Sequence, residues 1–596
     1  MSPCSHFSSH RIVAGCSRRY GCFVKDVQLQ LVENWSLGST LAFWRWPEGE
    51  QRRAFRDGMD PYCQSEPPAF KPRFKQPKPE VFDLLLPKFQ AIIARGYVVG
   101  KQDSTEQLHS SGDFIVSNID FFGVPKDRDI RVVYNGASCG LNKTVWAPNF
   151  WLPTAKSATR VLNFNYCGVD LDLGEMFLNF PLPLLFRSFS GIDLLPYQEA
   201  LGFGHLSSKE FQIRWERCWM GFRPSPYYAV RFYHWAEEFA RGNRREKGNL
   251  LRWDEVRLNL PGASAFNPTL PRVMKWDLSI DNIAGDITTF VDDLRASGID
   301  EETTWRIARQ VASRLQYLGI QDAPRKRRPP TRKTGAWAGS IFSTKNNKII
   351  QTVSQEKWDK GKAQVKELTD QLSSSPDAKF SYKRLEQIRG FLCHLSMTFE
   401  AVTPFLKGFH LTLCAHLPSR DDDGWKLPEG SFLSYINEKR CCGSITEEEA
   451  RASLNPPDHG DIPIPEQVLP VSRFRDDVFA LKELLSSEKP PSVTVRSNSV
   501  FEVVYGFGDA SGKGFGSTIL SSRGIKYRIG LWGADDAGES SNWKEFENQV
   551  EALEQEAKDG NLTGSMIFFY TDNSTVESCL YKGNSSSPKL FLLMVR

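Results

Sequence analysis

The sequence predicts an α+β fold class with more than one domain. Strand-like and helix-like stretches follow one another without strict alternation, and the pattern changes to a separate α/β segment near the C-terminus. The predicted helices lie at 80–96, 302–318, 356–373 and 381–414, and the predicted strands of the first half lie at 115–119 and 130–134. After Pro490-Pro491, the alternating run Phe501-Glu502-Val503-Val504-Tyr505 starts a new β pattern. We therefore expect a domain boundary there.

The two clearest helices show apolar residues at helical spacing. The first begins at Glu80, ends at Gly96 and has this apolar face: Val81, Leu84, Leu85, Phe89, Ile92 and Ile93. The second begins at Glu302, stops before Gly319 and has this apolar face: Trp305, Ile307, Ala308, Val311, Leu315 and Leu318. Glycine directly after the last apolar residue is a common helix terminator. The basic, proline-containing stretch 323–335 is then expected to be a loop.

Composition favours a large globular protein of the cell interior. With 596 residues, of which 40% are hydrophobic and 12% aromatic, the chain is long and apolar enough for several cores. Its twelve cysteines have no paired metal-ligand spacing, which is typical of reduced thiols. We expect an intracellular location, either cytoplasmic or nuclear. No apolar run approaches the ~20 residues that cross a bilayer, so no membrane partner is expected.

Basic residues are clustered although the formal net charge is only +4. The runs 241–247 and 325–328 are the clearest clusters. Each could contact nucleic-acid phosphates, and a solvated loop is the alternative for either run taken alone.

An acidic pair, Asp292-Asp293, follows the β-favouring run Ile287-Thr288-Thr289-Phe290. Because Leu294 resumes the apolar pattern, the sequence predicts a tight strand–turn–strand with both carboxylates at the tip, where they could hold a divalent metal. An acidic pair alone indicates no more than a solvated turn. The chain has other acidic clusters, at Asp421-Asp422-Asp423, Asp476-Asp477 and Asp535-Asp536.

A second acidic segment, Asp172-Leu173-Gly174-Glu175-Met176-Phe177, lies about 120 residues earlier. It resembles the first palm motif of retroelement reverse transcriptases, in which an Asp is followed five positions later by Tyr or Phe. Phe290-Val291-Asp292-Asp293 resembles the third palm motif of the same family, usually Tyr-x-Asp-Asp. Asp170 competes for the role of Asp172, but only Asp172 has the family's interval to an aromatic residue. The resemblance makes Phe177 the candidate deoxyribose gate, with a core aromatic as the alternative.

Two more segments lie in the family's order. Met220-Gly221-Phe222-Arg223-Pro224-Ser225-Pro226 resembles the second palm motif, in which Gly221 would allow the backbone to approach the template–nucleotide pair and Pro226 would open a helix. The stretch from Val124 to Asn142 resembles the fingers segment, which implies that Arg131 contacts the nucleotide triphosphate through its planar donors.

Downstream, Leu318 to Lys326 resembles the fourth palm motif. The resemblance implies that Lys326 approaches the pyrophosphate, and Arg325 and Lys333 are the alternatives. Trp337-Ala338-Gly339-Ser340 would form the primer-grip hairpin.

The chemistry of the family explains these residue types. Joining a primer 3′-hydroxyl to a nucleoside triphosphate builds charge on the attacking and leaving oxygens, which two divalent ions can stabilise. The resemblance implies Mg²⁺ (or Mn²⁺) held by Asp172 and Asp292, with Asp293 as the supporting acid.

The C-terminal segment carries an independent acidic pattern. Asp509 precedes a Gly-rich hairpin, Glu545 lies in a predicted helix that Ser541 or Asn542 would cap, and Asp572 ends the apolar run Met566 to Tyr570. This order resembles ribonuclease H, which implies that the three carboxylates bind metal and hydrolyse RNA paired with DNA. The family uses a further helix and a fourth acid, so we expect this domain to be truncated and its nuclease activity to be in doubt.

Together the resemblance covers roughly residues 80–596 and implies a right-hand polymerase (fingers, palm, thumb) followed by an α/β ribonuclease H-like domain. The expected divisions are an irregular leader at 1–79, fingers and palm at 80–335, thumb and connection at 336–415, a linker at 416–497 and the ribonuclease H-like domain at 498–596. The chain is most similar to this portion of a DIRS-like or gypsy-like retrotransposon polyprotein.

The expected function is RNA-directed DNA polymerase. Its partners would be an RNA or DNA template with a primer, and deoxynucleoside triphosphates. The alternative is a decayed or domesticated nucleic-acid-binding protein that keeps the fold without turnover.

Overall fold

The computed structural model describes residues 50–59, 62–70, 78–103, 113–126, 129–159, 162, 167–320, 328–345, 348–375, 378–428, 430–454, 462–497 and 502–596. Most of the predicted leader and Lys326 lie outside these residues. The chain divides into two compact units. Unit 1 comprises Met1–Pro153, Tyr166–Val256 and Lys275–Thr331, and unit 2 comprises Thr154–Asn165, Arg257–Met274 and Arg332–Arg596.

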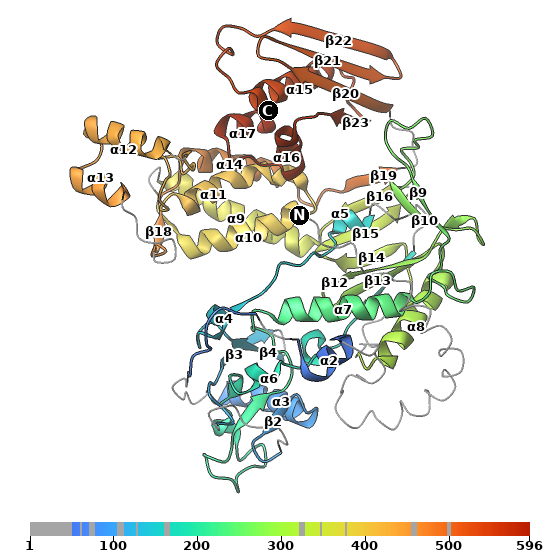
Figure 1. Ribbon diagram of the computed structural model, residues 1–596, viewed down its shortest axis with the longest axis vertical. Coiled ribbons are helices and arrows are strands. Elements are labelled where there is room, and N and C mark those ends of the chain that lie inside the picture. Colours follow the sequence, from blue (N-terminus) through green and yellow to red (C-terminus); the bar gives the residue numbers. More distant parts are fainter. Residues whose placement is uncertain are drawn as a thin grey trace. The chain divides into compact units, whose positions relative to one another are not determined.

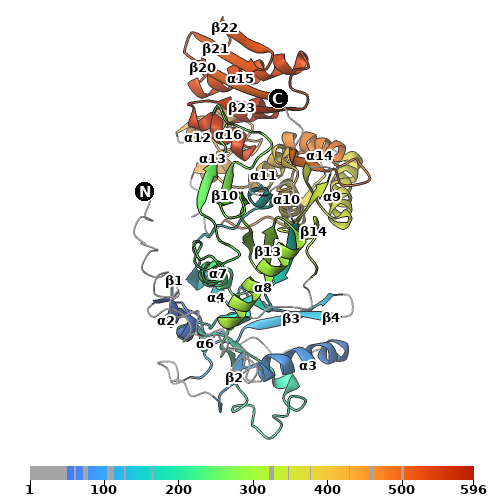
Figure 2. The same cartoon turned by 90° about the vertical axis from the view of Figure 1, so that its right-hand side faces the viewer.

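In unit 1, a β-hairpin lies beside the first predicted helix. That helix is α3 (Pro79–Ala94), and it packs against β4 (Asp129–Asn135), which pairs with β3 (Asp120–Lys126) (Figure 2). The predicted strand at 130–134 is therefore confirmed. The predicted strand at 115–119 is wrong, because this stretch divides its backbone hydrogen bonds among Phe70, Ser188 and Gly191 and forms an isolated bridge rather than a continuous ladder. Its Ile119 side chain is buried in the core.

A three-stranded antiparallel sheet in the order β12-β13-β6 forms the centre of unit 1. Its strands are β6 (Cys167–Asp172), β12 (Asp286–Phe290) and β13 (Asp293–Gly298). One face is apolar and buried, and it carries these side chains: Val169, Leu171, Ile287, Leu294 and Ala296. The helices α7 (Ser225–Arg241) and α8 (Glu301–Tyr317) join the same core, and α8 packs on β6 and β13. The helix predicted at 302–318 is confirmed, and the opposite face of the sheet carries the acidic residues.

The basic run 241–247 begins inside the protein and not in a protruding loop. Arg241, the last residue of α7, forms ion pairs with Glu237 and Asp286. Lys275 also forms an ion pair with Asp286, with 2.8 Å between Nζ and Oδ2. Burial opposes the charge of Asp286, but Arg241 and Lys275 outweigh it and hold the pKa of this carboxyl below its ordinary value. Arg241 therefore ties α7 to β12 and is not available for a phosphate contact.

Unit 2 begins with a four-stranded antiparallel sheet in the order β14-β15-β16-β19. Its strands are β14 (Lys333–Trp337), β15 (Ser340–Lys345), β16 (Lys348–Thr352) and β19 (Val493–Ser497). The turn between β14 and β15 falls at Ala338 and Gly339, both with positive φ, so the residues predicted as a hairpin do form one.

A helical core follows in unit 2. Its helices are α9 (Gln355–Ser374), α10 (Tyr382–Ser396), α11 (Lys407–Cys414) and α14 (Ser472–Leu484). The predicted helical region 381–414 thus consists of α10 and α11, which two short 3-10 turns separate around Pro404. Within the range predicted as a linker, α14 packs against α9 and α11, and its Phe474, Val478 and Leu481 are fully buried.

Asp477 of α14 is a fully buried carboxylate that should make stability depend on pH. It accepts hydrogen bonds from the Gly408 N–H (2.7 Å) and from Arg473 Nε (2.7 Å), but burial outweighs both and raises its pKa to about 6. A raised pKa in the folded state stabilises the protein at low pH, and that contribution is lost as pH rises through about 6.

We expect the free energy of unfolding of the wild type, relative to Asp477→Asn, to fall by at most about 3 kcal/mol between pH 4 and pH 7.5. Denaturant unfolding of both proteins at several pH values measures this difference, and carboxylates common to both cancel. A difference that stays constant with pH would contradict the assignment.

The last part of unit 2 is a sheet in the order β22-β21-β20-β23, in which β20 and β23 are parallel. Its elements are β20 (Glu502–Ala510), β21 (Gly514–Ser521), β22 (Gly524–Leu531), α15 (Ser541–Lys558), β23 (Ser565–Tyr570), α16 (Ser574–Lys582) and α17 (Pro588–Val595). Figure 1 shows these strands in orange-red with α15 along one face. There Ala552 of α15 packs with Val504, Ile519 and Phe569.

The segment 257–274 of unit 2 lies on the other face of this sheet. Its Phe266 contacts Phe568 of β23 edge-to-face at 5.6 Å, and the Arg272 guanidinium lies 4.6 Å from the centre of the Phe568 ring. The Tyr505 hydroxyl of β20 accepts a hydrogen bond from the Gly262 N–H at 3.0 Å. We call residues 257–274 the strap. It contacts Tyr505, Met566 and Phe568 and comes close to the Tyr570 hydroxyl, while the rings of Phe507 and Tyr570 stay half-exposed.

The remaining described elements are short or peripheral. The chain enters the strap through β9 (Glu255–Leu258) and leaves it through β10 (Val273–Asp277). The other elements are α2 (Glu50–Asp57), β1 (Tyr62–Cys63), β2 (Val98–Gly100), α4 (Leu141–Thr144), β5 (Val145–Trp146), α5 (Ala155–Thr159), η3 (Met176–Asn179), α6 (Leu184–Arg187), β7 (Gly191–Ile192), η4 (Leu195–Tyr197), β8 (Ile213–Trp215), β11 (Asn282–Ile283), β17 (Phe380–Ser381), η6 (Glu400–Val402), η7 (Pro404–Leu406), α12 (Ser431–Cys441), α13 (Glu447–Leu454) and β18 (Gln467–Val468). Within the described ranges, none of the helices combines the length and the apolar character that a membrane span requires.

Candidate metal centres

The structure brings Asp172, Asp292 and Asp293 together where β6 ends and β13 begins, at one end of the sheet in unit 1. Asp172 is the last residue of β6 and Asp293 the first of β13, and the two are direct cross-strand partners. Asp292 lies in the two-residue turn between β12 and β13, where its carbonyl accepts a hydrogen bond from the Leu173 N–H at 3.1 Å. The predicted strand–turn–strand is confirmed, and its acidic tip lies against the end of β6.

Two like charges directly opposite each other destabilise a sheet unless a cation compensates them. Here Asp172 faces Asp293 across the β6–β13 pair, and neither of them is buried. Divalent ions such as Mg²⁺ take carboxylate oxygens as ligands, so the side chains of this pair suit a bound cation.

Asp170 has a different partner. The Arg295 side chain, whose exposed fraction is 5%, donates to both Asp170 oxygens, from Nε at 2.7 Å and from Nη2 at 3.1 Å. Asp170 and Arg295 are cross-strand partners two residues along from Asp172 and Asp293, so both pairs lie on the same face. This bidentate ion pair assigns Asp170 to holding β6 against β13.

The acidic turn is also a point of backbone strain. Val291 has a φ of 54°, in the left-handed region where a β-branched residue is an outlier. Such positions cost about 1–3 kcal/mol and cluster at functional sites. The two-residue turn nevertheless keeps Asp292 and Asp293 at the tip of the hairpin.

Glu175 and Phe177 follow Asp172 in the first palm-like segment. Glu175 is exposed but has partners within unit 1: its carboxylate accepts a hydrogen bond from the Tyr97 hydroxyl at 2.6 Å and pairs with Arg95. Phe177 lies in η3, is half-buried and packs against the core of unit 1. Phe177 therefore has packing contacts of its own, and its role as a sugar gate stays a prediction.

Gly221 is required where the second palm-like segment crosses β4. Its φ is 105°, and a Cβ added to it would lie 1.9 Å from the carbonyl oxygen of Tyr134. Asn142 fixes the same crossing, because its side chain donates to the Gly221 carbonyl at 2.9 Å and accepts from the Arg223 N–H at 2.8 Å. One close approach that this glycine permits is thus to the protein's own backbone, and its predicted approach to the template–nucleotide pair stays a prediction. Pro226 does open α7, as predicted.

We expect Gly221→Ala to lower the free energy of unfolding by about 2–5 kcal/mol, because the methyl group meets a backbone carbonyl and the positive φ becomes strained. Gly248→Ala is the matched control in unit 1: a Cβ there meets nothing within 4 Å, and the change should stay within about 0.5 kcal/mol. Thermal or denaturant unfolding measures both. Equal stability of the two variants would mean that the crossing over β4 is loose.

Arg131 and Lys326 were predicted to bind the nucleotide. Arg131 is exposed on β4, within the β3–β4 hairpin. Lys326 and its alternative Arg325 lie outside the described residues, and Lys333 is the first residue of β14. The nucleotide contacts of Arg131 and Lys326 remain predictions.

The second acidic group lies in the last part of unit 2. Asp509 is near the end of β20, Glu545 is in the first turns of α15 and Asp572 follows β23. Each residue offers one carboxylate oxygen, and these atoms all lie within 4.8 Å of one another. In the part of the chain that the structure describes, Asp509, Glu545 and Asp572 are the three carboxylates whose oxygens meet this 4.8 Å limit. The oxygens of Asp172, Asp292 and Asp293, the Asp172 group, lie farther apart.

Glu545 is the buried member, with an exposed fraction of 3%, while Asp509 and Asp572 are exposed. Its carboxylate accepts hydrogen bonds from the Ala510 N–H at 2.8 Å and from the Thr571 hydroxyl at 3.4 Å. Burial, helped by repulsion from Asp509 and Asp572, outweighs these bonds and raises the pKa of Glu545 above its ordinary value. A divalent cation would relieve this repulsion, so the three residues suit a metal.

Buried polar residues of α15 support this group, and sequence reasoning missed them. Asn548, which is fully buried, donates to the carbonyls of Asp509 (3.1 Å) and Gly516 (2.9 Å), and so holds β20 and β21 in place. Lys544 is 3% exposed and donates to the Gly512 carbonyl at 3.0 Å. The available signal was the stretch 544–549, polar at every position except Phe546, on a helix that must pack against a sheet.

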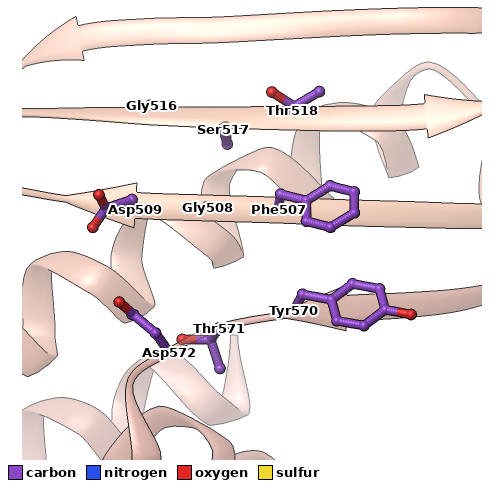
Figure 3. A pocket seen from close by; sticks show the side chains of 9 residues that line it. All are labelled: Phe507, Gly508, Asp509, Gly516, Ser517, Thr518, Tyr570, Thr571 and Asp572. Atoms are coloured by element: carbon purple, nitrogen blue, oxygen red, sulfur yellow. The ribbon is translucent and has the colours of Figure 1, made fainter. Parts of the chain in front are cut away.

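A hollow of about 430 Å³ lies beside Asp509 and Asp572. Its lining comes from β20, β21 and β23: Phe507, Gly508, Asp509, Gly516, Ser517, Thr518, Tyr570, Thr571 and Asp572. Figure 3 shows the two acids at one end of this hollow and the rings of Phe507 and Tyr570 at the other. The hollow thus joins a candidate metal centre to an aromatic surface.

No family model and no curated protein matches the chain. Among solved structures it is similar to a foamy viral protease–reverse transcriptase dRH in complex with double-stranded DNA, with 12% identity, a TM-score of 0.42, and coverage of 96% of this chain and 79% of that one. A foamy viral protease–reverse transcriptase with an RNA/DNA hybrid matches at 13% identity and a TM-score of 0.40, over 92% of this chain and 56% of that one. A TM-score below 0.5 does not establish a common fold. What bears on function is the arrangement of the chain's own carboxylates.

Proposed function

We propose that the chain is an RNA-directed DNA polymerase of the retrotransposon type, which extends a primer on a nucleic-acid template. The observation that carries this proposal is the register of the β6–β13 pair, which sets Asp293 opposite Asp172 and leaves Asp292 in the adjoining turn. The segments that resemble the palm and fingers motifs lie in one unit with them, and Asn142 links two of these segments directly.

Asp172, Asp292 and Asp293 are the residues that would hold Mg²⁺ or Mn²⁺. Their donor atoms fit such ions, because the three side chains offer carboxylate oxygens from two neighbouring strand ends. When bound, the ions would stabilise charge on the attacking and leaving oxygens of the nucleotidyl transfer. The role of this chain's own residues is to fix the carboxylates, and the Asp170–Arg295 ion pair and the β12–β13 turn do so.

Primer extension on a poly-rA template with an oligo-dT primer tests the proposal. With Mg²⁺ and dTTP the full chain should lengthen the primer, and EDTA in excess of the metal should stop the reaction. A poly-dA template of equal length shows whether the polymerase prefers RNA. If the chain binds primer–template but adds no nucleotide with either ion, the proposal fails, and a non-catalytic nucleic-acid-binding role replaces it. One observation favours this alternative: the carboxylate oxygens of Asp172, Asp292 and Asp293 do not all lie within 4.8 Å of one another, whereas those of Asp509, Glu545 and Asp572 do.

A second activity, hydrolysis of RNA paired with DNA, is proposed for Asp509, Glu545 and Asp572. It is supported by the mutual approach of their oxygens within 4.8 Å and by the raised pKa that repulsion and burial give to Glu545. The three carboxylates would hold the divalent ion, which when bound would activate water for attack on the phosphodiester. A labelled RNA–DNA hybrid, incubated with the full chain and Mg²⁺, reports this activity independently of primer extension.

A further inference from the structure

The hollow beside Asp509 and Asp572 also contains two half-exposed aromatic rings, which a metal centre alone does not require. Two large aromatic side chains, Phe507 of β20 and Tyr570 of β23, form its far end and are 45% and 40% exposed. Their ring centres lie 5.0 Å apart and their planes differ by 8°. Figure 3 shows both rings on the side of the sheet where Asp509 and Asp572 lie. Leaving two such rings in water is unfavourable, so a ligand that covers them would gain free energy.

The neighbouring strand leaves space for such a ligand. Phe507 is the cross-strand partner of Thr518, and Asp509 is the partner of Gly516. A glycine and a short hydroxyl side chain therefore lie beside the ring and the acid, where a large residue would fill the hollow. The Thr518 hydroxyl can also donate or accept a hydrogen bond at the edge of a planar group.

The same row of aromatic residues already holds a planar group at its other end. Tyr505, Phe568, Phe507 and Tyr570 follow one another on one face of β20 and β23, since Tyr505 pairs with Phe568 and Phe507 with Tyr570. The strap places the Arg272 guanidinium over Phe568, 4.6 Å from the ring centre, where it also lies 4.8 Å from the centre of the Phe266 ring. The part of the row nearest the acids is the part that stays half-exposed.

We propose that Phe507 and Tyr570 form a stacking subsite for an unpaired nucleobase of the strand whose phosphate approaches Asp509 and Asp572. This inference rests on the nuclease activity proposed above and adds the class of substrate. Phe507 lies two residues before Asp509, which is about 6.6 Å along a strand and suits the distance between a base and its own phosphate. Stacking needs a free face of the base, so the base that the subsite takes is an unpaired one, in a single-stranded overhang or at a frayed end of the RNA–DNA hybrid.

Binding of single-stranded oligonucleotides tests the proposal. The probe is fluorescein-labelled ten-residue oligo-dT, with Ca²⁺ in place of Mg²⁺ to offset the repulsion between phosphates and carboxylates without turnover. Its partner probe has the same backbone with abasic sites instead of thymines. Fluorescence anisotropy gives Kd for the full chain and for Phe507→Leu and Tyr570→Leu. The matched control is Tyr581→Leu, whose side chain is 83% exposed on α16, away from the hollow.

Phe507→Leu and Tyr570→Leu should each weaken binding of oligo-dT by roughly 5-fold to 100-fold, as expected for the loss of one stacked base. The abasic probe should bind the variants and the wild type alike, and Tyr581→Leu should change neither Kd. Unchanged binding of oligo-dT in both variants, or equal losses with the abasic probe, would overturn the proposal. Both rings are half-exposed, so the variants should fold, and their melting curves check this.

A photocrosslink locates the contact, since oligonucleotides also have other basic surfaces to bind. Oligo-dT carrying one 5-iodouracil, irradiated on the full chain, should give peptide adducts at Phe507 or Tyr570 by mass spectrometry. Adducts that form only in other segments would count against the subsite. Adducts at these rings in a chain that never hydrolyses a hybrid would support the stacking subsite while refuting the nuclease, so the two proposals can fail separately.

Discussion

Asp172→Asn and Asp292→Asn should each lower the rate of primer extension by at least about 100-fold, the usual cost of removing a group that stabilises charge in a transition state. Either change removes one negative charge from the site with almost no change in shape, so the metal would be held less well. The rate of dTTP incorporation on poly-rA and oligo-dT, measured with saturating Mg²⁺, gives the loss. Partial rescue of Asp172→Asn by Mn²⁺ would further indicate that the lost group is a metal ligand.

Asp170→Asn is the control that the structure supplies, because Asp170 lies two residues from Asp172 on the same face of β6. Losing the carboxylate partner of the buried Arg295 should lower the free energy of unfolding by about 1–3 kcal/mol. The folded variant should retain primer extension within a few-fold of the wild type. Equal incorporation by Asp292→Asn and the wild type would refute the polymerase site, and a loss in Asp170→Asn as large as in Asp172→Asn would refute the division of roles.

Glu545→Gln should lower hydrolysis of an RNA–DNA hybrid by at least about 100-fold and leave primer extension unchanged. The amide oxygen can still accept the Ala510 N–H, so the local fold should persist while the charge is lost. Asp509→Asn should give a similar loss. Release of labelled RNA fragments in Mg²⁺ measures the effect on the full chain.

Asp535→Asn is the matched control for this site. Asp535 is an exposed acid in the same part of unit 2, and it lies outside the Asp509 group, so its variant should hydrolyse the hybrid at the wild-type rate. Hydrolysis that survives in both Glu545→Gln and Asp509→Asn would mean that a contaminating nuclease or another site is responsible. No hydrolysis by the wild type in Mg²⁺ or Mn²⁺ would refute the proposed activity.

Local sequence patterns were sufficient to predict the acidic β12–β13 hairpin in unit 1. Ile287 to Phe290 favours a strand, Leu294 resumes the apolar pattern and the two acids between them suit a turn, so the β12–β13 hairpin follows from residues in one short stretch. The same holds for α7, which Pro226 opens, and for α8, which stops before Gly319. The strand predicted at 115–119 was wrong, because whether an apolar segment pairs along its length depends on distant partners.

The roles of Asp170 and Arg241 depended on distant partners too. Asp170 and Asp172 look alike in sequence, and only the register with β13 shows that Arg295 faces the first and Asp293 the second. Arg241 begins a basic run that suggested a surface loop, but its ion pair with Asp286, 45 residues later, holds its side chain against β12. Long-range ion pairs of this kind leave no periodic signal in the sequence. The predicted domain ranges and the predicted nucleotide contacts remain predictions.

The strap links parts of the chain that are made far apart in time. The Gly262 N–H donates to the Tyr505 hydroxyl across 243 positions of sequence, so this contact can form only after Tyr505 has left the ribosome. Contacts of such high sequence separation form slowly, because a long loop must close first. Until then Tyr505 and Phe568 are without the strap's cover, on a sheet face that also presents Tyr527, Ile529 and Leu531 to water. A C-terminal fragment that starts at Glu502 would keep this face uncovered permanently, and it should therefore aggregate more readily than the full chain.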